Sequence, residues 1–366
     1  MKVVVAPDKF AGTLSAAEAA EAMAAGWARA RPGDDVVVVP MADGGEGTLE
    51  VVEAAVAGCR RVTVEVADPR GRAVAADWLR LPDGRGLVEA AQACGLWRLQ
   101  PQERNPRQAT SYGVGQLLAA AVDAGCSEVV VGLGGSATVD GGAGLAIALG
   151  HRLLRTDGNG VRVGGQYLRQ LARIVPAPAP AARVVAAVDV TNPLLGPDGA
   201  VATFAPQKGA APEDLPVLEQ ALATLADVAE RYLPDGPWRD LPGAGAAGGL
   251  GFALAGFCRA RLTGGAEAVA ELVGLGAALD GAAVALTGEG ALDAQTRRGK
   301  VPAFVGERGR AVGAVVGAVA GRVADGAQQG FDAVAALGPE GPRRARELVV
   351  ERTAELARRI GQEADG

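Results

Sequence analysis

Residues 128–144, which read EVVVGLGGSATVDGGAG, decide the fold. Three valines at 129–131 are typical of a buried strand, and a glycine-rich loop follows before an apolar helix at 145–149. A strand, a glycine loop and a helix in this order place backbone N–H groups and a helix N-terminus in front of an anion. The same pattern also occurs as a plain tight turn in packed α/β domains, so the other loops of the chain decide between the two interpretations.

The composition limits the class of protein. The 366 residues are 49% hydrophobic and include 54 glycines, but only 4% are aromatic, so alanine and valine have to fill much of the core. The formal net charge of −6 gives no basic footprint for nucleic acid. The apolar run at 311–321 is too short to span a bilayer, and the first residues lack a signal-peptide core. We expect a cytoplasmic protein, a monomer or a homodimer, with no nucleic-acid or membrane partner.

Buried strands recur along the chain, and each is followed by a loop that combines glycine with an acid or a hydroxyl. The apolar runs 2–6, 36–39, 183–188 and 282–286 predict such strands. The loops after them begin PDKFAG, PMADGGEG, DVTNP and TGEGALD. Because open parallel sheets bind ligands at the carboxyl ends of their strands, we expect these loops to form a site.

Residues 60–90 break this pattern, because apolar and polar residues alternate there between turns, as in antiparallel strands. The sequence therefore predicts an α/β protein with two different domains. One is discontinuous and Rossmann-like with a parallel sheet, formed by residues 1–75 and 280–366. The other is inserted at 76–279 and combines a mixed sheet with helices.

The chemistry of the loops favours a polyanion site. His151 is the single histidine and the four cysteines have no CxxC spacing, so we expect a carboxylate as general base and no structural zinc. His151 follows a predicted helix end, where we expect it to complement the helix dipole or to lie at the surface. Lysines among glycines, carboxylates for Mg²⁺ and a carboxylate base are what phosphoryl transfer needs. The chain has neither a Walker P-loop nor the protein-kinase motifs.

Several segments then occur in a fixed order: APDKFAGTLSA, ADGGEGT, RNPRQATSYG, GLGGSATVDGGAG, DVTNPLLG with FAPQKGA, GAGAAGGLG and TGEGALDAQTRRGKVP. Together they resemble the type I bacterial glycerate kinase family, the glycerate 2-kinase type, over nearly the whole chain. The resemblance implies phosphorylation of D-glycerate by ATP with Mg²⁺, to 2-phosphoglycerate rather than 3-phosphoglycerate, in organic-acid and glyoxylate carbon metabolism. It also implies an active site in the cleft between the two domains.

Carried onto this sequence, the resemblance assigns roles to individual residues. Asp189 is the first choice for a Mg²⁺ ligand or general base, followed by Asp43, also as a metal ligand, and Asp293. Lys9 and Lys300 would neutralise phosphate, and Arg104 or Arg298 would hold the glycerate carboxylate. The remaining substrate and phosphate candidates are Asp8, Gly44, Gly45, Ser111, Gly134, Gly135, Ser136, Thr138, Asn192, Lys208 and Glu289.

Three residues depart from the family's pattern. Ala11, Val139 and Ala291 stand where the family often has lysine, asparagine and arginine, which leaves phosphate or carboxylate contacts at these positions open. Two other functions also stay open. Residues 132–137 match G-x-G-x-x-A after a strand, as in an NAD(P)-dependent dehydrogenase of a small hydroxy acid. The departures would also fit a non-catalytic sugar-acid sensor on the same fold.

Overall fold

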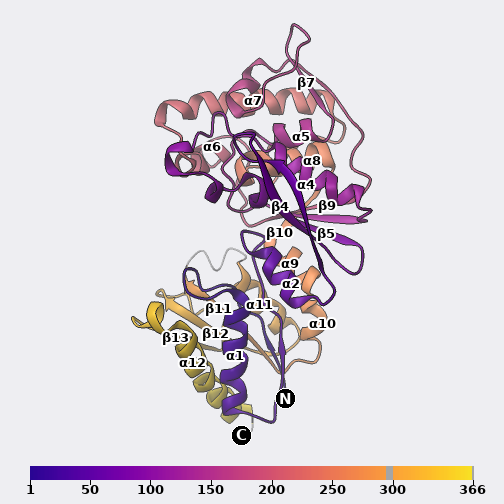
Figure 1. The fold of residues 1–366 in the computed structure, drawn as a ribbon. Coiled ribbons are helices and arrows are strands. Elements are labelled where there is room, and N and C mark those ends of the chain that lie inside the picture. The colour runs from indigo at the N-terminus through magenta and orange to yellow at the C-terminus, as the bar shows by residue number, and fades with distance from the viewer. Residues whose placement is uncertain (294–299, 365–366) are drawn as a thin grey trace. The chain divides into compact units, whose positions relative to one another are not determined.

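The computed structural model describes residues 1–293 and 300–364, which form two compact units that are each discontinuous in sequence (Figure 1). Unit 1 comprises Met1–Asp43, Glu50–Ala57 and Gly265–Gly366, and unit 2 comprises Gly44–Leu49 and Gly58–Gly264. The expected divisions at 75/76 and 279/280 therefore lie elsewhere. Strand β3 (Arg60–Ala67) pairs over its whole length with β4 (Ala73–Arg80) of unit 2, and α9 (Gly265–Val273) and α10 (Leu275–Leu279) pack on α11 (Val301–Ala311) of unit 1.

Unit 1 contains a five-stranded parallel sheet, as the apolar runs predict. Numbered in chain order within this unit, its strands lie in the order 2-1-3-4-5, the arrangement of a doubly wound sheet. The strand order reverses between β1 and β11, and such a switch point opens a crevice at the carboxyl ends of the two strands. The strands are β1 (Lys2–Val5), β2 (Asp35–Val38), β11 (Val284–Leu292), β12 (Val315–Val323) and β13 (Ala333–Ala336).

Helices cover both faces of this sheet. Val284 and Leu286 of β11 belong to the core that α1 (Ala16–Ala30) and α12 (Gly341–Ala364) close. Successive strand residues point to opposite faces, and Ala285 accordingly lies against Gly309 of α11. Helix α1 begins with a capping box at the S-x-x-E spacing of Ser15 and Glu18, in which the Ser15 side chain accepts from the Glu18 N–H and the Glu18 carboxylate accepts from the Ser15 N–H.

Strand β11 is longer than the sequence predicts, because the expected loop after 286 continues as strand to Leu292. Strand β12 pairs with it as far as Leu292↔Val323, and the two backbones approach so closely that a Cβ on Gly321 would collide with the Gly290 carbonyl. Glycine at these positions therefore serves strand packing. As a consequence, Glu289 is held on a strand rather than on a turn.

Unit 2 contains the predicted mixed sheet, in the order β10-β9-β6-β5-β4-β3. The first four strands are parallel, and β4 and β3 continue antiparallel, as the alternation at 60–90 indicates. Strands β7 and β8 form a separate antiparallel pair. The strands not yet bounded are β5 (Arg85–Glu89), β6 (Glu128–Gly132), β7 (Arg152–Leu154), β8 (Arg173–Val175), β9 (Arg183–Val188) and β10 (Arg261–Gly264).

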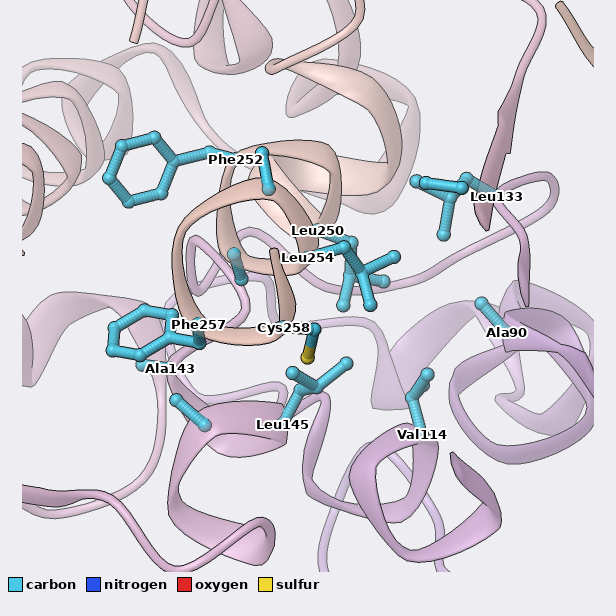
Figure 2. Packing of buried hydrophobic residues seen from close by; sticks show 14 of the residues in the cluster. Ala90, Val114, Leu133, Ala143, Leu145, Leu250, Phe252, Leu254, Phe257 and Cys258 are labelled. Carbon is cyan, nitrogen blue, oxygen red and sulfur yellow. The ribbon is translucent and has the colours of Figure 1, made fainter. Parts of the chain in front are cut away.

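The core of unit 2 joins several helices to the sheet. Figure 2 shows Leu254 and Cys258 of α8 facing Leu145 of α5, with Val114 of α4 beside them. Aliphatic side chains dominate this cluster, as the low aromatic content requires. The remaining helices are α2 (Thr48–Ala55), α3 (Ala90–Cys94), α4 (Tyr112–Asp123), α5 (Ala143–Ala148), α6 (Ala200–Phe204), α7 (Leu215–Tyr232) and α8 (Ala246–Cys258), with short 3₁₀ turns at Leu96–Arg98, Pro101–Glu103, Gly165–Gln170, Pro206–Lys208 and Pro212–Asp214.

Among the residues that the structure describes, no helix combines the length and apolarity needed to cross a membrane.

The contact between α1 and α12 yields a stability prediction at Gly26. A Cβ there would lie 2.8 Å from Thr353 Cβ and collide with the Val350 carbonyl. Gly26→Ala is therefore expected to destabilise the protein by about 1–3 kcal/mol in chemical denaturation, although alanine is the better helix former. Ala28→Leu, on the exposed side of the same helix, is the control and should change stability by less than about 0.5 kcal/mol. A Gly26→Ala protein as stable as wild type would contradict the close packing.

Candidate active site

Acidic side chains gather at the switch point of unit 1. The backbone after β1 stays hydrogen-bonded to β11, because the Asp8 N–H donates to the Gly288 carbonyl over 2.8 Å. This places Asp8 beside Glu289, and both side chains are buried, with 8% and 7% exposure. Asp43, which follows β2 on the other side of β1, also interacts electrostatically with Asp8. The structure therefore brings together Asp8, Asp43 and Glu289, which the sequence places in three separate loops.

The electrostatics of this cluster are unfavourable for three negative charges. Burial is the largest cause that raises the pKa of Asp8, to about 7, and Asp43 and Glu289 raise it further. The Lys9 N–H, which donates to Asp8 Oδ1 over 2.7 Å, and the Lys9 charge only partly oppose this. A hard cation would relieve the repulsion, and oxygen ligands of this kind fit Mg²⁺.

Mg²⁺ usually binds one or two carboxylates and completes its coordination with phosphates and water. Within residues 1–293 and 300–364, no group of three or more His, Cys, Asp or Glu side chains is placed to hold a metal ion. One or two of the carboxylates of Asp8, Asp43 and Glu289 would therefore need phosphate and water to complete the coordination of Mg²⁺.

Three other predicted site residues of unit 1 are Lys9, Asp293 and Lys300. Lys9 is exposed immediately after Asp8, and Asp293 is half-buried just after the end of β11. Lys300 is half-buried and occupies the position before the first turn of α11. Arg298 lies outside the described residues.

The glycine loop after β6 contacts the loop that contains Gly44 and Gly45. A Cβ on Gly132 would collide with the Gly44 carbonyl, and a Cβ on Gly134 would collide with Gly45 Cα. The G-x-G-x-x-A match at 132–137 therefore has a packing explanation, in which two backbones pass without side chains between them. Gly135 differs, because it is exposed and has a φ of +65°.

Asp140 organises the next part of this loop. It is fully buried, and its carboxylate accepts hydrogen bonds from the Ser111 N–H and Oγ–H, both at 2.8 Å, and from the N–H groups of Gly142 and Gly144. Ser111 Oγ also accepts from the Leu145 N–H, and it makes no capping bond to α4. Ser111 therefore does not cap α4 with its side chain, because its hydroxyl donates to the buried carboxylate of Asp140 instead.

Lys208 is a lysine buried in unit 2. Its side chain is 3% exposed, and Nζ donates to Ser136 Oγ over 3.0 Å and to the Thr138 carbonyl over 2.8 Å. Burial lowers the pKa of Lys208 to about 8, although Cys94 and Asp140 act in the opposite direction. A buried cation bonded to neutral oxygens is suited to an anion. The structure thus joins Lys208, Ser136 and Thr138, three predicted residues.

The other candidates of unit 2 differ in what surrounds them. Asp189 is exposed directly after β9, whose neighbour in the sheet is β6. Asn192 donates to the Asp198 carbonyl and to Thr203 Oγ1, so its amide holds a turn. Arg104 packs its Cβ against Gly209, next to Lys208, and its buried Nε has no hydrogen-bond partner among the described residues.

The structure corrects the prediction for His151 and adds Glu89, which was not predicted. His151 is buried, not at the surface, because its ring packs edge-on against Phe257 and its Nδ1 accepts from the Ala177 N–H, while burial lowers its pKa. Glu89 is 1% exposed at the carboxyl end of β5 and accepts from the Leu49 N–H over 2.6 Å. Its signal in the sequence is an acid that ends an apolar run.

Comparisons with known proteins agree with each other. The model of a family described as the glycerate kinase family matches residues 3–364. The glycerate kinase of Bacillus subtilis is 43% identical over 316 residues, 85% of this chain and 82% of the relative. The glycerate 2-kinase of Escherichia coli is 40% identical over 307 residues, 82% of this chain and 80% of the relative. A crystal structure of a putative glycerate kinase 2 from Salmonella typhimurium superposes with a TM-score of 0.90 at 39% identity, covering both chains fully.

The raised pKa of Asp8 predicts how stability depends on pH without divalent cations. The ordinary pKa is 3.8 and the folded value about 7, so the unfolded chain releases this proton first and the contribution of Asp8 to wild-type stability falls as pH rises from about 4 to 7. Asp8→Asn removes this loss. Its advantage over wild type should grow across that range and level off above about pH 8, at no more than about 4 kcal/mol.

Urea unfolding of both proteins at a series of pH values measures this difference. Asp325→Asn, an exposed acid of the same unit, is the matched control and should follow the wild-type curve. If the free energy of unfolding depended on pH in the same way for wild type and Asp8→Asn, the pKa of Asp8 would not be raised in the folded protein.

Proposed function

Because the chain belongs to the glycerate kinase family and is a glycerate-phosphorylating kinase, we propose that it transfers the γ-phosphate of ATP to D-glycerate with Mg²⁺. Membership in this family argues against a dehydrogenase of a hydroxy acid, and the assay of ADP release below tests the alternative of a non-catalytic sugar-acid sensor on the same fold. The Escherichia coli relative is a glycerate 2-kinase, which supports 2-phosphoglycerate as the product. Three further points stay predictions: that the protein acts in the cytoplasm, that it serves organic-acid and glyoxylate metabolism, and that it is a monomer or a homodimer.

The observation that carries the proposal is the acidic cluster at the switch point of unit 1. Asp43, with Asp8 and Glu289 beside it, would hold Mg²⁺. Bound there, the ion would neutralise charge on the phosphates of ATP. The burial that raises the pKa of Asp8 also keeps water from these carboxylates, so a divalent cation gains more from them than it would from exposed acids. Lys9 and Lys300 would pair with phosphate oxygens, and Lys9 is exposed immediately after Asp8. Asp293 would be a further Mg²⁺ ligand or general base at this site.

Groups in unit 2 fit the acid substrate and its hydroxyl. Lys208 would bind the glycerate carboxylate together with Arg104, whose buried Nε has no hydrogen-bond partner in the described part of the chain. Ser136 would orient the carboxylate through Lys208. Asp189 would accept the proton of the attacking hydroxyl, because it is an exposed carboxylate and the single histidine is buried in the core. Gly135, which is exposed, leaves room for the substrate to approach the backbone.

A coupled assay of ADP release tests the proposed reaction. With ATP, Mg²⁺ and D-glycerate the protein is expected to release ADP, and L-glycerate should give less than a tenth of that rate. Phosphorus NMR of the product should show 2-phosphoglycerate. Equal rates with both enantiomers, or a product phosphorylated at the 3-hydroxyl, would contradict the stated stereochemistry or position, and no ADP release from folded protein would contradict ATP as donor.

The role of Asp189 as base gives a separate prediction. Asp189→Asn removes the proton acceptor and should lower kcat by about 10²-fold or more. Because the side chain is exposed, its melting temperature should stay at the wild-type value. Asp198→Asn, another exposed acid of unit 2, is the matched control and should keep wild-type turnover. An Asp189→Asn protein with unchanged kcat would remove this residue from the mechanism.

A further inference from the structure

A cavity of about 520 Å³ lies within unit 1, and no role has yet been given to it. Its lining comes from the turn after β1, the carboxyl-terminal parts of β11 and β12, the segment after β13 and the start of α12. These residues are mostly apolar or glycine, including Phe10, Gly290, Leu337 and Gly341, and Arg322 adds a positive charge. The volume is typical of a small-molecule site, and the position is where open parallel sheets bind ligands.

The lining indicates what kind of group fits. Glycerate is a small anion that needs polar partners on every side, so a mostly apolar cavity of this volume does not suit it. A flat base does, because Gly338 has open space where a Cβ would stand and Leu337 adds apolar contact.

The cavity is continuous in sequence with the acidic cluster. Phe10 follows Asp8 by two residues, which separates their Cα atoms by at most about 7 Å, and Gly290 follows Glu289 directly on β11. A ligand with a flat base at one end and phosphates at the other would therefore engage both features. We infer that this cavity binds the adenosine part of ATP, which assigns nucleotide binding to unit 1. The inference rests on the proposed use of ATP.

A bulky side chain in the cavity tests the assignment. Ala336 is exposed at the end of β13 and lines the cavity, so Ala336→Trp fills part of it without entering the core. Titration calorimetry with MgADP should show a dissociation constant raised at least 10-fold. The KM for ATP should rise with it, while the KM for D-glycerate should stay within about twofold of wild type.

Ala28→Trp is the matched control, because it adds the same side chain to an exposed position of α1 outside the cavity. It should bind MgADP as wild type does. If wild type uses ATP and folded Ala336→Trp binds MgADP equally well, the cavity assignment is overturned and the proposed function stands. If wild-type protein neither binds MgADP nor uses ATP, the proposed function fails and the assignment fails with it.

Photolabelling of wild-type protein gives an answer that does not depend on how the variant folds. We expect 8-azido-ATP to modify peptides that contain residues 10–13 or 321–342, and excess ATP to prevent the labelling. Labelling confined to peptides from 58–264 would place the base in unit 2 and overturn the inference.

Discussion

The buried carboxylate of Asp140 holds the glycine loop of unit 2 in its shape. Four donors surround it, two from Ser111 and one each from Gly142 and Gly144, so the loop is tied to the start of α4 and to α5. Burial nevertheless raises its pKa, which shows that desolvation outweighs these bonds. The segment that this carboxylate fixes includes the Ser136 hydroxyl and the Thr138 carbonyl, to which Lys208 donates. The position of the buried cation thus depends on a buried anion that never needs to touch substrate.

Unit 1 has the opposite electrostatic design. Asp8 interacts with two further acids, Asp43 and Glu289, and the hydrogen bond from the Lys9 N–H only partly offsets the rise of its pKa. Asp140 is satisfied by protein donors, whereas the cluster around Asp8 gains from a cation. The difference separates a carboxylate that supports the fold from one that is available for chemistry. Both kinds follow strands and lie near glycines, so the motif alone does not distinguish them.

Glycine motifs in this chain have two physical origins. Gly132, Gly134 and Gly321 are glycines because another backbone passes where a Cβ would stand, and Gly135 is an exposed glycine with positive φ. The first kind looks like a nucleotide fingerprint when only the sequence is read. The expected loop after residue 286 was wrong for a related reason, because close pairing with β12 extends β11 as far as Leu292. Where a strand ends, and why a glycine is needed, is decided here by the neighbouring backbone that pairs with or passes the segment.

The sequence by itself determined the α/β class, the parallel and antiparallel parts, the capping box at Ser15 and the family, because local periodicity and short motifs carry that information. It also singled out Asp8, Asp43, Glu289 and Lys208 as residues for chemistry. Only the tertiary structure decided the strand order, and with it the meeting of Asp8 with Glu289, which are separated by 280 positions in the chain. Burial and hydrogen-bond partners, which separate Asp140 from Asp8, exist only once the chain has folded, because desolvation is a property of the packed interior.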